Sequence, residues 1–338
     1  MKSIVGNRML LHRNRFPDFE TTSFYELCEF VSYQEQLHCP EESYYSKIIE
    51  ELESFIYALK DRSKQSKTNG IKINEDFEKY IKNNLENINE LMSTVNEFSP
   101  EVSLFKNRFN KLIKDNKRNR AIVSSLDLHI AELVKYLKEY LNVTKLTKEK
   151  NKLRTRIVKN RASLSKYVEN LFNENSKLEV IRFEISYELN ESKQDSIKIF
   201  AKYRDKLFYY LSKILLKDRL LGYIWKLQPQ QQDGSISCHI ILFLKAHGVK
   251  SKDYNFEMED LKKEWSNLTD DRGGYWKCNS FFKYRSQGIG LISNLDGEKY
   301  KELKNAMKYL ANPDYFIRLD LPKGIRAYGR GEIKVQAK

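Results

Sequence analysis

Long apolar runs are missing from this 338-residue chain, and so is the apolar segment of a secretory signal peptide. A membrane-spanning helix needs about 20 consecutive apolar residues, so the sequence predicts a soluble protein that stays in the compartment where it is made. Cysteine is scarce, and Cys28, Cys39, Cys238 and Cys278 never occur in C-x-x-C spacing. This scatter argues against a zinc site and a disulfide framework, and it favours free thiols in a reducing cytosol.

Acidic residues are scarce in one segment only. The chain has a net charge of +14, divided into −6 over residues 1–105, +13 over 106–166 and +7 over 167–338. Hydrophobic residues make up 41% of the sequence and aromatic residues 12%, so a packed core is expected despite the charge. A basic excess concentrated in one segment predicts a polyanionic partner, and nucleic acid is favoured over a membrane surface.

Helical apolar periodicity dominates the first half of the sequence. It runs through residues 48–59 and 77–91, and it returns at 122–141 and 147–173. We expect an acidic helical module over residues 1–105, followed by a basic helical segment over 106–174. The apolar faces of the module are expected to form its core, and a partner surface is the alternative.

The basic helical segment carries candidate phosphate contacts. Solvated helix faces usually alternate in charge sign, whereas this segment has few acids. Nucleic-acid contact is therefore favoured over a solvated face, without any helix-turn-helix, zinc-finger or ribonucleoprotein signature. The candidates are Lys117, Arg118, Arg120, Lys150 and Arg154.

The second half of the sequence changes to a mixed strand and helix pattern. Its expected strands lie at 178–189, in a hairpin over 220–246, and at 288–293 and 315–320, and its expected helices lie at 199–215, 258–265 and 297–310. With 247–295 treated as an insertion, the order is β-α-β-β-α-β over residues 175–338. The predicted fold class is α+β, with an all-helical N-terminal half followed by a ferredoxin-like antiparallel sheet that has its helices on one face.

Five short segments of this half stand in an order that resembles a known family. They are Leu221–Leu227, His239–Phe243, Tyr275–Asn279, Gly288–Gly290 and Tyr328–Gly331. Together they resemble the YagK/YfjJ C-terminal domain family, which includes replication proteins of filamentous phages (inoviruses) and their prophage relatives. That family resembles, in turn, the rolling-circle replication initiators of the HUH endonuclease class. The resemblance covers residues 165–332 and implies the same Rep-like fold.

The resemblance implies a DNA-nicking site on the hairpin. In the HUH class, two histidines and an acidic or amide oxygen hold Mg²⁺ or Mn²⁺, which polarises the phosphate that a tyrosine attacks. Carried over to this sequence, the metal ligands are His239, Gln228 and Glu184. Ser237 stands where the first histidine is expected, and Gln228 stands where glutamate is usual. The implied site is therefore either degenerate or a weak metal site.

Tyr309 is the candidate nucleophile that the resemblance implies. It lies late on the helix before the last strand, although Asn312 replaces the lysine that usually follows it. Tyr315, at the start of the expected strand, is the weaker alternative, and a structural role is the alternative for both. Arg326 and Arg330 lie in a glycine-rich loop where the backbone can approach a phosphate closely, and a solvated loop is the alternative.

These observations predict a DNA-binding, replication-initiator-like protein of phage or prophage type in the cytoplasm of a bacterial host. Its expected partner is single-stranded DNA or a hairpin origin, with no membrane partner. An active rolling-circle nickase that uses a tyrosine and a divalent metal is the alternative, so an enzymatic role stays open. An interaction protein that acts through the acidic helices is a third hypothesis, and it leaves the basic segment without a role.

Overall fold

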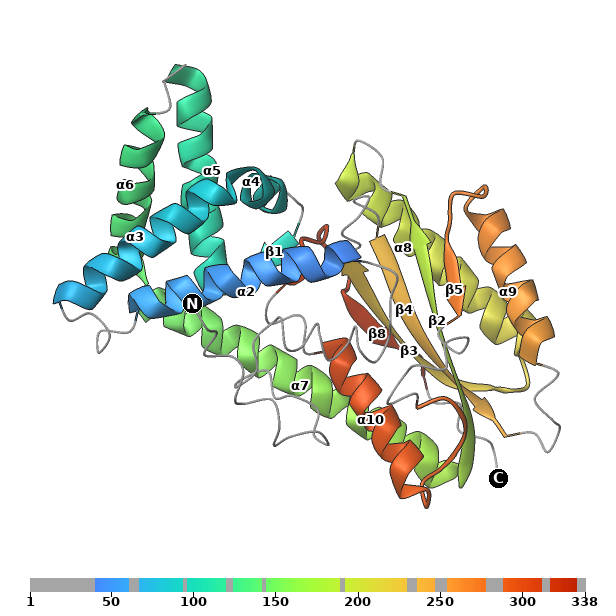
Figure 1. Cartoon of the computed structure of the whole chain (residues 1–338). Coiled ribbons are helices and arrows are strands. Elements are labelled where there is room, and N and C mark those ends of the chain that lie inside the picture. Colours follow the sequence, from blue (N-terminus) through green and yellow to red (C-terminus); the bar gives the residue numbers. More distant parts are fainter. Residues whose placement is uncertain are drawn as a thin grey trace.

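The computed structural model describes residues 40–60, 67–93, 96–119, 124–141, 144–188, 192–229, 236–246, 254–277, 288–311 and 317–332. It is an α+β fold in which a group of helices adjoins an antiparallel sheet (Figure 1). The prediction of an α+β fold is therefore confirmed. Among the described residues, no helix is both long and apolar enough to cross a bilayer.

The N-terminal part consists of helices around one apolar core. The helices are α2 (Pro40–Lys60), α3 (Lys67–Asn83), α4 (Leu85–Ser93), α5 (Pro100–Asn119), α6 (Ser124–Tyr140) and α7 (Thr144–Glu174). Their shared core includes Leu52, Phe77, Phe105, Leu137 and Ile157. The boundary expected at residue 105 falls inside α5. The net charge changes sign at this point of the sequence, but the apolar core continues across it.

The central sheet is antiparallel and contains the expected hairpin. Its strands are β2 (Lys177–Tyr187), β3 (Leu220–Pro229), β4 (Ile236–Lys245), β5 (Tyr275–Lys277), β6 (Gly290–Ser293) and β8 (Tyr328–Arg330). The order is β5-β2-β4-β3-β8, and β6 also pairs with β2. The helices of this part are α8 (Lys193–Tyr210), continued by a π-helical turn at Leu211–Leu215, α9 (Tyr254–Leu268) and α10 (Gly297–Ala311).

Helices cover both faces of this sheet (Figure 1). Phe183 and Ile240 pack with Phe200 of α8 and Trp265 of α9 on one face. On the other face, Phe243 belongs to a second core that α7 and α10 complete. The expectation of helices on one face is therefore wrong. Its physical reason is that β2 and β4 are buried along nearly their whole length, which requires a cover on each side.

The strand expected to complete the sheet belongs to a separate ribbon. Strand β7 (Ile317–Leu319) pairs antiparallel with β1 (Asn96–Phe98), and the register places Glu97 opposite Arg318. The N-terminal half is thus not entirely helical, and β7 is not the fourth strand of a ferredoxin-like sheet. The β1–β7 ribbon instead joins the N-terminal helices to the C-terminal part.

Candidate nucleic-acid interface

Helix α7 carries the candidate interface, and its sequence gives it two different faces. Leu153, Ile157 and Leu164 recur at helical spacing and are buried, the first two in the helical core and Leu164 against the sheet. At its C-terminal end, the side chain of Asn175 donates to the carbonyl of Leu171 over 3.0 Å and satisfies one of the open carbonyls. The other face of α7 is left to polar and basic side chains.

Three adjoining clefts follow this polar face. The largest, about 910 Å³, is walled by α7 and by the segment from β7 to β8. A second cleft of about 600 Å³ lies between α7, α5 and β1, and a third of about 550 Å³ lies on α7 itself. Arg156 lines all three clefts, so they form one continuous surface, which we call the α7 groove.

Among the described residues, basic side chains outnumber acidic ones on the walls of the α7 groove. The eight basic residues are Lys106, Lys148, Lys152, Arg156, Lys159, Arg318, Arg326 and Arg330. The four acidic residues are Glu97, Glu149, Asp320 and Glu332. This excess of positive charge suits a polyanionic chain, because neutralising phosphates with lysine and arginine dominates nucleic-acid affinity.

Two of the expected phosphate contacts lie elsewhere on α7. The Lys150 Nζ lies 2.9 Å from Oε1 of Glu101, whose side chain is only 11% exposed, so this pair holds α7 against α5. Arg154 is exposed. Two residues along a helix correspond to roughly 160° around its axis, so Arg154 points away from both Lys152 and Arg156.

The other two described candidates, Arg326 and Arg330, do line the groove. Arg326 is exposed. The Nη1 of Arg330 donates to the carbonyl of Ser163 over 2.9 Å, and its guanidinium lies 5.2 Å from the centre of the Tyr167 ring. These contacts hold Arg330 against α7 in the wall of the largest cleft.

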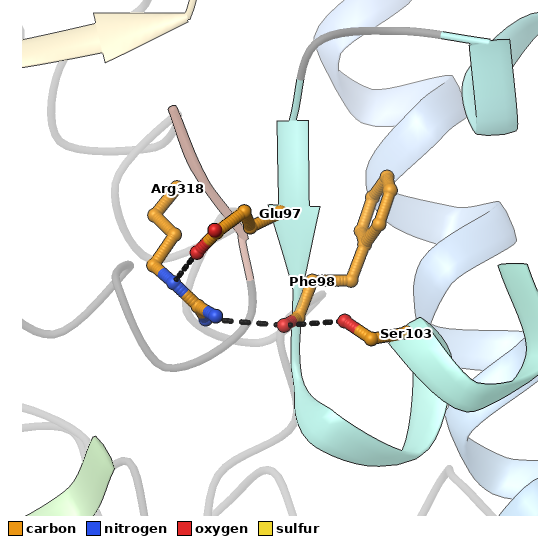
Figure 2. Close-up of polar contacts among 4 residues, drawn as sticks. All are labelled: Glu97, Phe98, Ser103 and Arg318. Carbon is orange, nitrogen blue, oxygen red and sulfur yellow. Dashed lines mark hydrogen bonds and ion pairs between the residues drawn. The ribbon is translucent and has the colours of Figure 1, made fainter. Parts of the chain in front are cut away.

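The two larger clefts meet at what we call the waist of the groove, formed by Glu97, Arg156, Arg318 and Asp320. Figure 2 shows how Arg318 reaches from β7 to β1 at this point. Its Nε donates to Oε2 of Glu97 over 2.5 Å, and its Nη1 donates to the carbonyl of Phe98 over 3.1 Å. One arginine therefore joins the two strands of the ribbon and lines the groove.

A second group of polar side chains lies on the sheet face covered by α7 and α10. The register places Glu184 of β2 opposite His239 of β4, and His239 opposite Lys226 of β3. Residues two apart on a strand share a face, so the same face also carries several neighbours. We call the whole set the polar row: Arg182, Glu184, Ser186, Lys226, Gln228, Ser237 and His239. All of them except Gln228 are buried.

His239 is held between Arg182 and Glu184. The Nε of Arg182 donates to Nε2 of His239 over 3.3 Å, and Nδ1 of His239 lies 3.9 Å from Oε2 of Glu184. Burial lowers the pKa of His239 well below its usual range, and the Arg182 guanidinium acts in the same direction. The imidazole is therefore neutral at neutral pH, with Nε2 as an acceptor.

The polar row does not match a Mg²⁺ or Mn²⁺ site. Among the expected ligands, Glu184 and His239 lie side by side, while Gln228 pairs with Ser237 in the neighbouring register position. These ions prefer several oxygen ligands, whereas Nε2 of His239 already accepts from Arg182 and Lys226 adds a second buried cation. No cluster of three metal-ligating side chains occurs in the part of the chain that the structure describes.

Several expected site residues, or their side chains, lie outside the described part of the structure. Arg120 is outside the described residues, and so are the side chains of Lys117 and Arg118 on α5 and of Tyr309 on α10. Helix α10 itself packs over the face that carries the polar row. The residue after Tyr309, Leu310, is buried and borders a small cavity together with Lys226.

Arg182, Lys226 and Arg318 are the residues that reasoning from the sequence missed. Arg182 stands two positions before Glu184, and Lys226 stands two before Gln228, so the two-residue period of a strand was a signal for both. Arg318 had no such signal, because its place depends on pairing with Glu97, which is 221 residues away in the sequence.

The sequence matches no family model, and no curated protein or solved structure is significantly similar to it. The resemblance to the phage replication proteins therefore rests on the five motifs alone.

Proposed function

We propose that this chain is a DNA-binding protein of the replication-initiator type, from a phage or prophage, and that the α7 groove holds the DNA backbone. The observation that carries the proposal is the continuity of the three clefts along α7, with twice as many basic as acidic side chains among the described residues of their walls. Contacts of this kind bind phosphates without reading bases, and they supply most of the non-specific affinity.

The partner proposed is a single strand or the unpaired part of a hairpin origin. The largest cleft has walls on two sides and a volume of about 910 Å³. That is the size of a small-ligand pocket, which accommodates a few nucleotides of one strand. A positively charged groove that follows one backbone is the usual arrangement in proteins that bind single strands.

The ferredoxin-like core belongs to the same proposal, in a form other than the one expected from the sequence. The elements β2, α8, β3, β4, α9 and β5 follow one another as β-α-β-β-α-β, and their strands have the spatial order β5-β2-β4-β3. This order places the first and third strands in the centre, as in the split βαβ arrangement. Here α9 and β5 take the places expected for α10 and β7.

The second candidate function is a nickase that uses Tyr309 as its nucleophile. One observation favours it: α10, which carries Tyr309, packs over the sheet face on which Glu184 and His239 lie together. The Arg182 and Lys226 side chains on the same face weigh against the metal that this chemistry needs. We therefore place nicking second and DNA binding first.

The two faces of α7 provide a matched test of DNA binding. We expect the double variant Lys152→Gln/Arg156→Gln to bind a fluorescent single-stranded oligonucleotide about tenfold or more weakly at low salt, because it removes two charges from the groove. Lys150→Gln/Arg154→Gln removes the same charge from the opposite face and should bind within about twofold of wild type. Fluorescence anisotropy at several salt concentrations measures both, and thermal unfolding checks that each variant is folded.

Equal losses in the two double variants would contradict the α7 groove as the binding surface. The same proteins, incubated with the oligonucleotide and Mn²⁺, also test the second candidate. A covalent protein–DNA band that is lost in Tyr309→Phe would support the nickase, and salt-dependent binding without such a band would leave binding alone.

A further inference from the structure

The waist of the α7 groove holds an arginine whose charge is shared with a carboxylate. Arg318 lines both larger clefts, and its Nε and Nη1 are used by Glu97 and the Phe98 carbonyl (Figure 2). Its Nη2 has no hydrogen-bond partner among the described residues. Part of the guanidinium is thus still available for an anion in the groove.

We propose that the Glu97–Arg318 ion pair is a latch in the DNA groove. A phosphate of the bound strand displaces the Glu97 carboxylate from Arg318 and is held by Arg318 together with Arg156. This inference rests on the proposed DNA binding, and it adds the contact that regulates the affinity of the groove.

The two partners of the ion pair are held very differently. The Arg318 side chain is 19% exposed and keeps its bond to the Phe98 carbonyl, whereas the Glu97 side chain is 48% exposed. The Phe98 carbonyl is itself fixed, because it also accepts from the Ser103 hydroxyl over 3.0 Å. Glu97 can therefore swing into solvent while Arg318 stays in place for the phosphate.

Phosphate is a suitable competitor for this carboxylate. A guanidinium presents its N–H groups as a planar fork that matches carboxylate and phosphate alike, so the two anions compete for the same N–H groups of Arg318. Arg156 lines the same waist and adds a second cation for the incoming phosphate. Asp320, the other acid of the waist, is exposed and adds to the repulsion that the strand must overcome.

The latch predicts that removing an acid strengthens binding through one particular arginine. Glu97→Gln keeps a carbonyl that accepts from Arg318, so the ribbon is preserved while the charge is lost. We expect this variant to bind a single-stranded oligonucleotide about two- to fivefold more tightly at low salt, which is the range of a partly exposed ion pair. The slope of log K against log salt should steepen by about 0.7, as one more phosphate contact requires.

A double-mutant cycle with Arg318→Gln separates a latch from general repulsion. If the latch exists, Glu97→Gln gains no more in the Arg318→Gln background than Glu332→Gln does, since no arginine is left to release. Glu332→Gln is the matched control: Glu332 lines the same cleft and makes no ion pair with any described residue. Its small gain should be the same in both backgrounds. Thermal unfolding of every variant shows whether the ribbon stays folded, and the equally uncharged Arg318→Met replaces Arg318→Gln if that variant does not.

The possible failures are distinguishable. If wild type binds DNA with salt dependence but Glu97→Gln binds no more tightly, or gains equally with and without Arg318, the latch is wrong and the groove stands. If wild type does not bind DNA even at low salt, the proposed function fails and the latch fails with it.

Discussion

At the scale of single residues, the buried His239 makes the stability of the folded chain depend on pH. Its imidazole is 1% exposed and accepts from Arg182, so the folded protein resists protonating it. The unfolded chain binds that proton near pH 6.5, which means that the unfolded state gains protons first as the pH falls. The stabilising effect of a neutral His239 is therefore complete above about pH 6.5 and is lost below it.

We expect His239→Gln to be less stable than wild type at neutral pH and to lose less stability on acidification. Between about pH 6.5 and pH 5 the free energy of unfolding of wild type should fall by up to about 1.4 kcal/mol per pH unit more steeply than that of the variant. Urea unfolding at a series of pH values measures this difference. Parallel curves for wild type and His239→Gln would contradict a buried neutral imidazole.

The sequence alone could predict part of the arrangement of side chains around His239. The two-residue strand period places Glu184 and His239 on facing positions once β2 and β4 are paired, and the structure brings them within 3.9 Å. The same period places Arg182 beside them, but a search for metal ligands alone overlooks this arginine. A buried arginine changes the chemistry of the row, so the side chains on a face must be read together.

At the scale of elements, the sequence predicted most helices and the hairpin but not the covering of the sheet. Helix α7 was expected as a basic helix, and it also packs against β3, where the ring of Tyr167 and the side chain of Leu171 lie over Gly222. The amide of Tyr223 donates to the Tyr167 hydroxyl over 3.2 Å. No sequence period reveals such a contact, because it depends on how closely a helix approaches a strand.

This close approach makes Gly222 a test of α7 packing. A Cβ at position 222 would collide with the Tyr167 hydroxyl, so Gly222→Ala should lower the free energy of unfolding by about 1–3 kcal/mol. In a Tyr167→Phe background the same change should have a smaller effect, because the hydroxyl is gone. Urea unfolding measures the cycle. Gly297→Ala, where a Cβ meets no atom of the described chain within 4 Å, should have little effect. A full loss in the Phe background would show that other atoms set the packing limit.

At the scale of the whole molecule, the groove draws its walls from both parts of the chain. Lys106 and Glu97 come from the helical part and its ribbon strand, whereas Arg326 lies just before β8 and Arg330 lies in β8 of the central sheet. The β1–β7 ribbon that aligns them pairs two strands of three residues each. The strand β7 was expected from the sequence, but β1 and its pairing with β7 were not, because the two strands lie 221 residues apart at Glu97 and Arg318. The groove was therefore not predictable, although most of its basic residues lie in segments expected to contact phosphate.

Because both parts contribute, DNA should stabilise the folded chain as one unit. At a free oligonucleotide concentration of about 100 Kd, binding adds about 2.7 kcal/mol, which corresponds to a rise in Tm of roughly 4 °C for a chain of this size. Differential scanning calorimetry should show one transition that moves as a whole, and Lys152→Gln/Arg156→Gln should move much less at the same concentration. Two transitions, of which DNA shifts only one, would mean that the groove belongs to a single part. The β1–β7 ribbon would then only connect the two parts of the chain, and Arg318 would not face the DNA across the groove from α7.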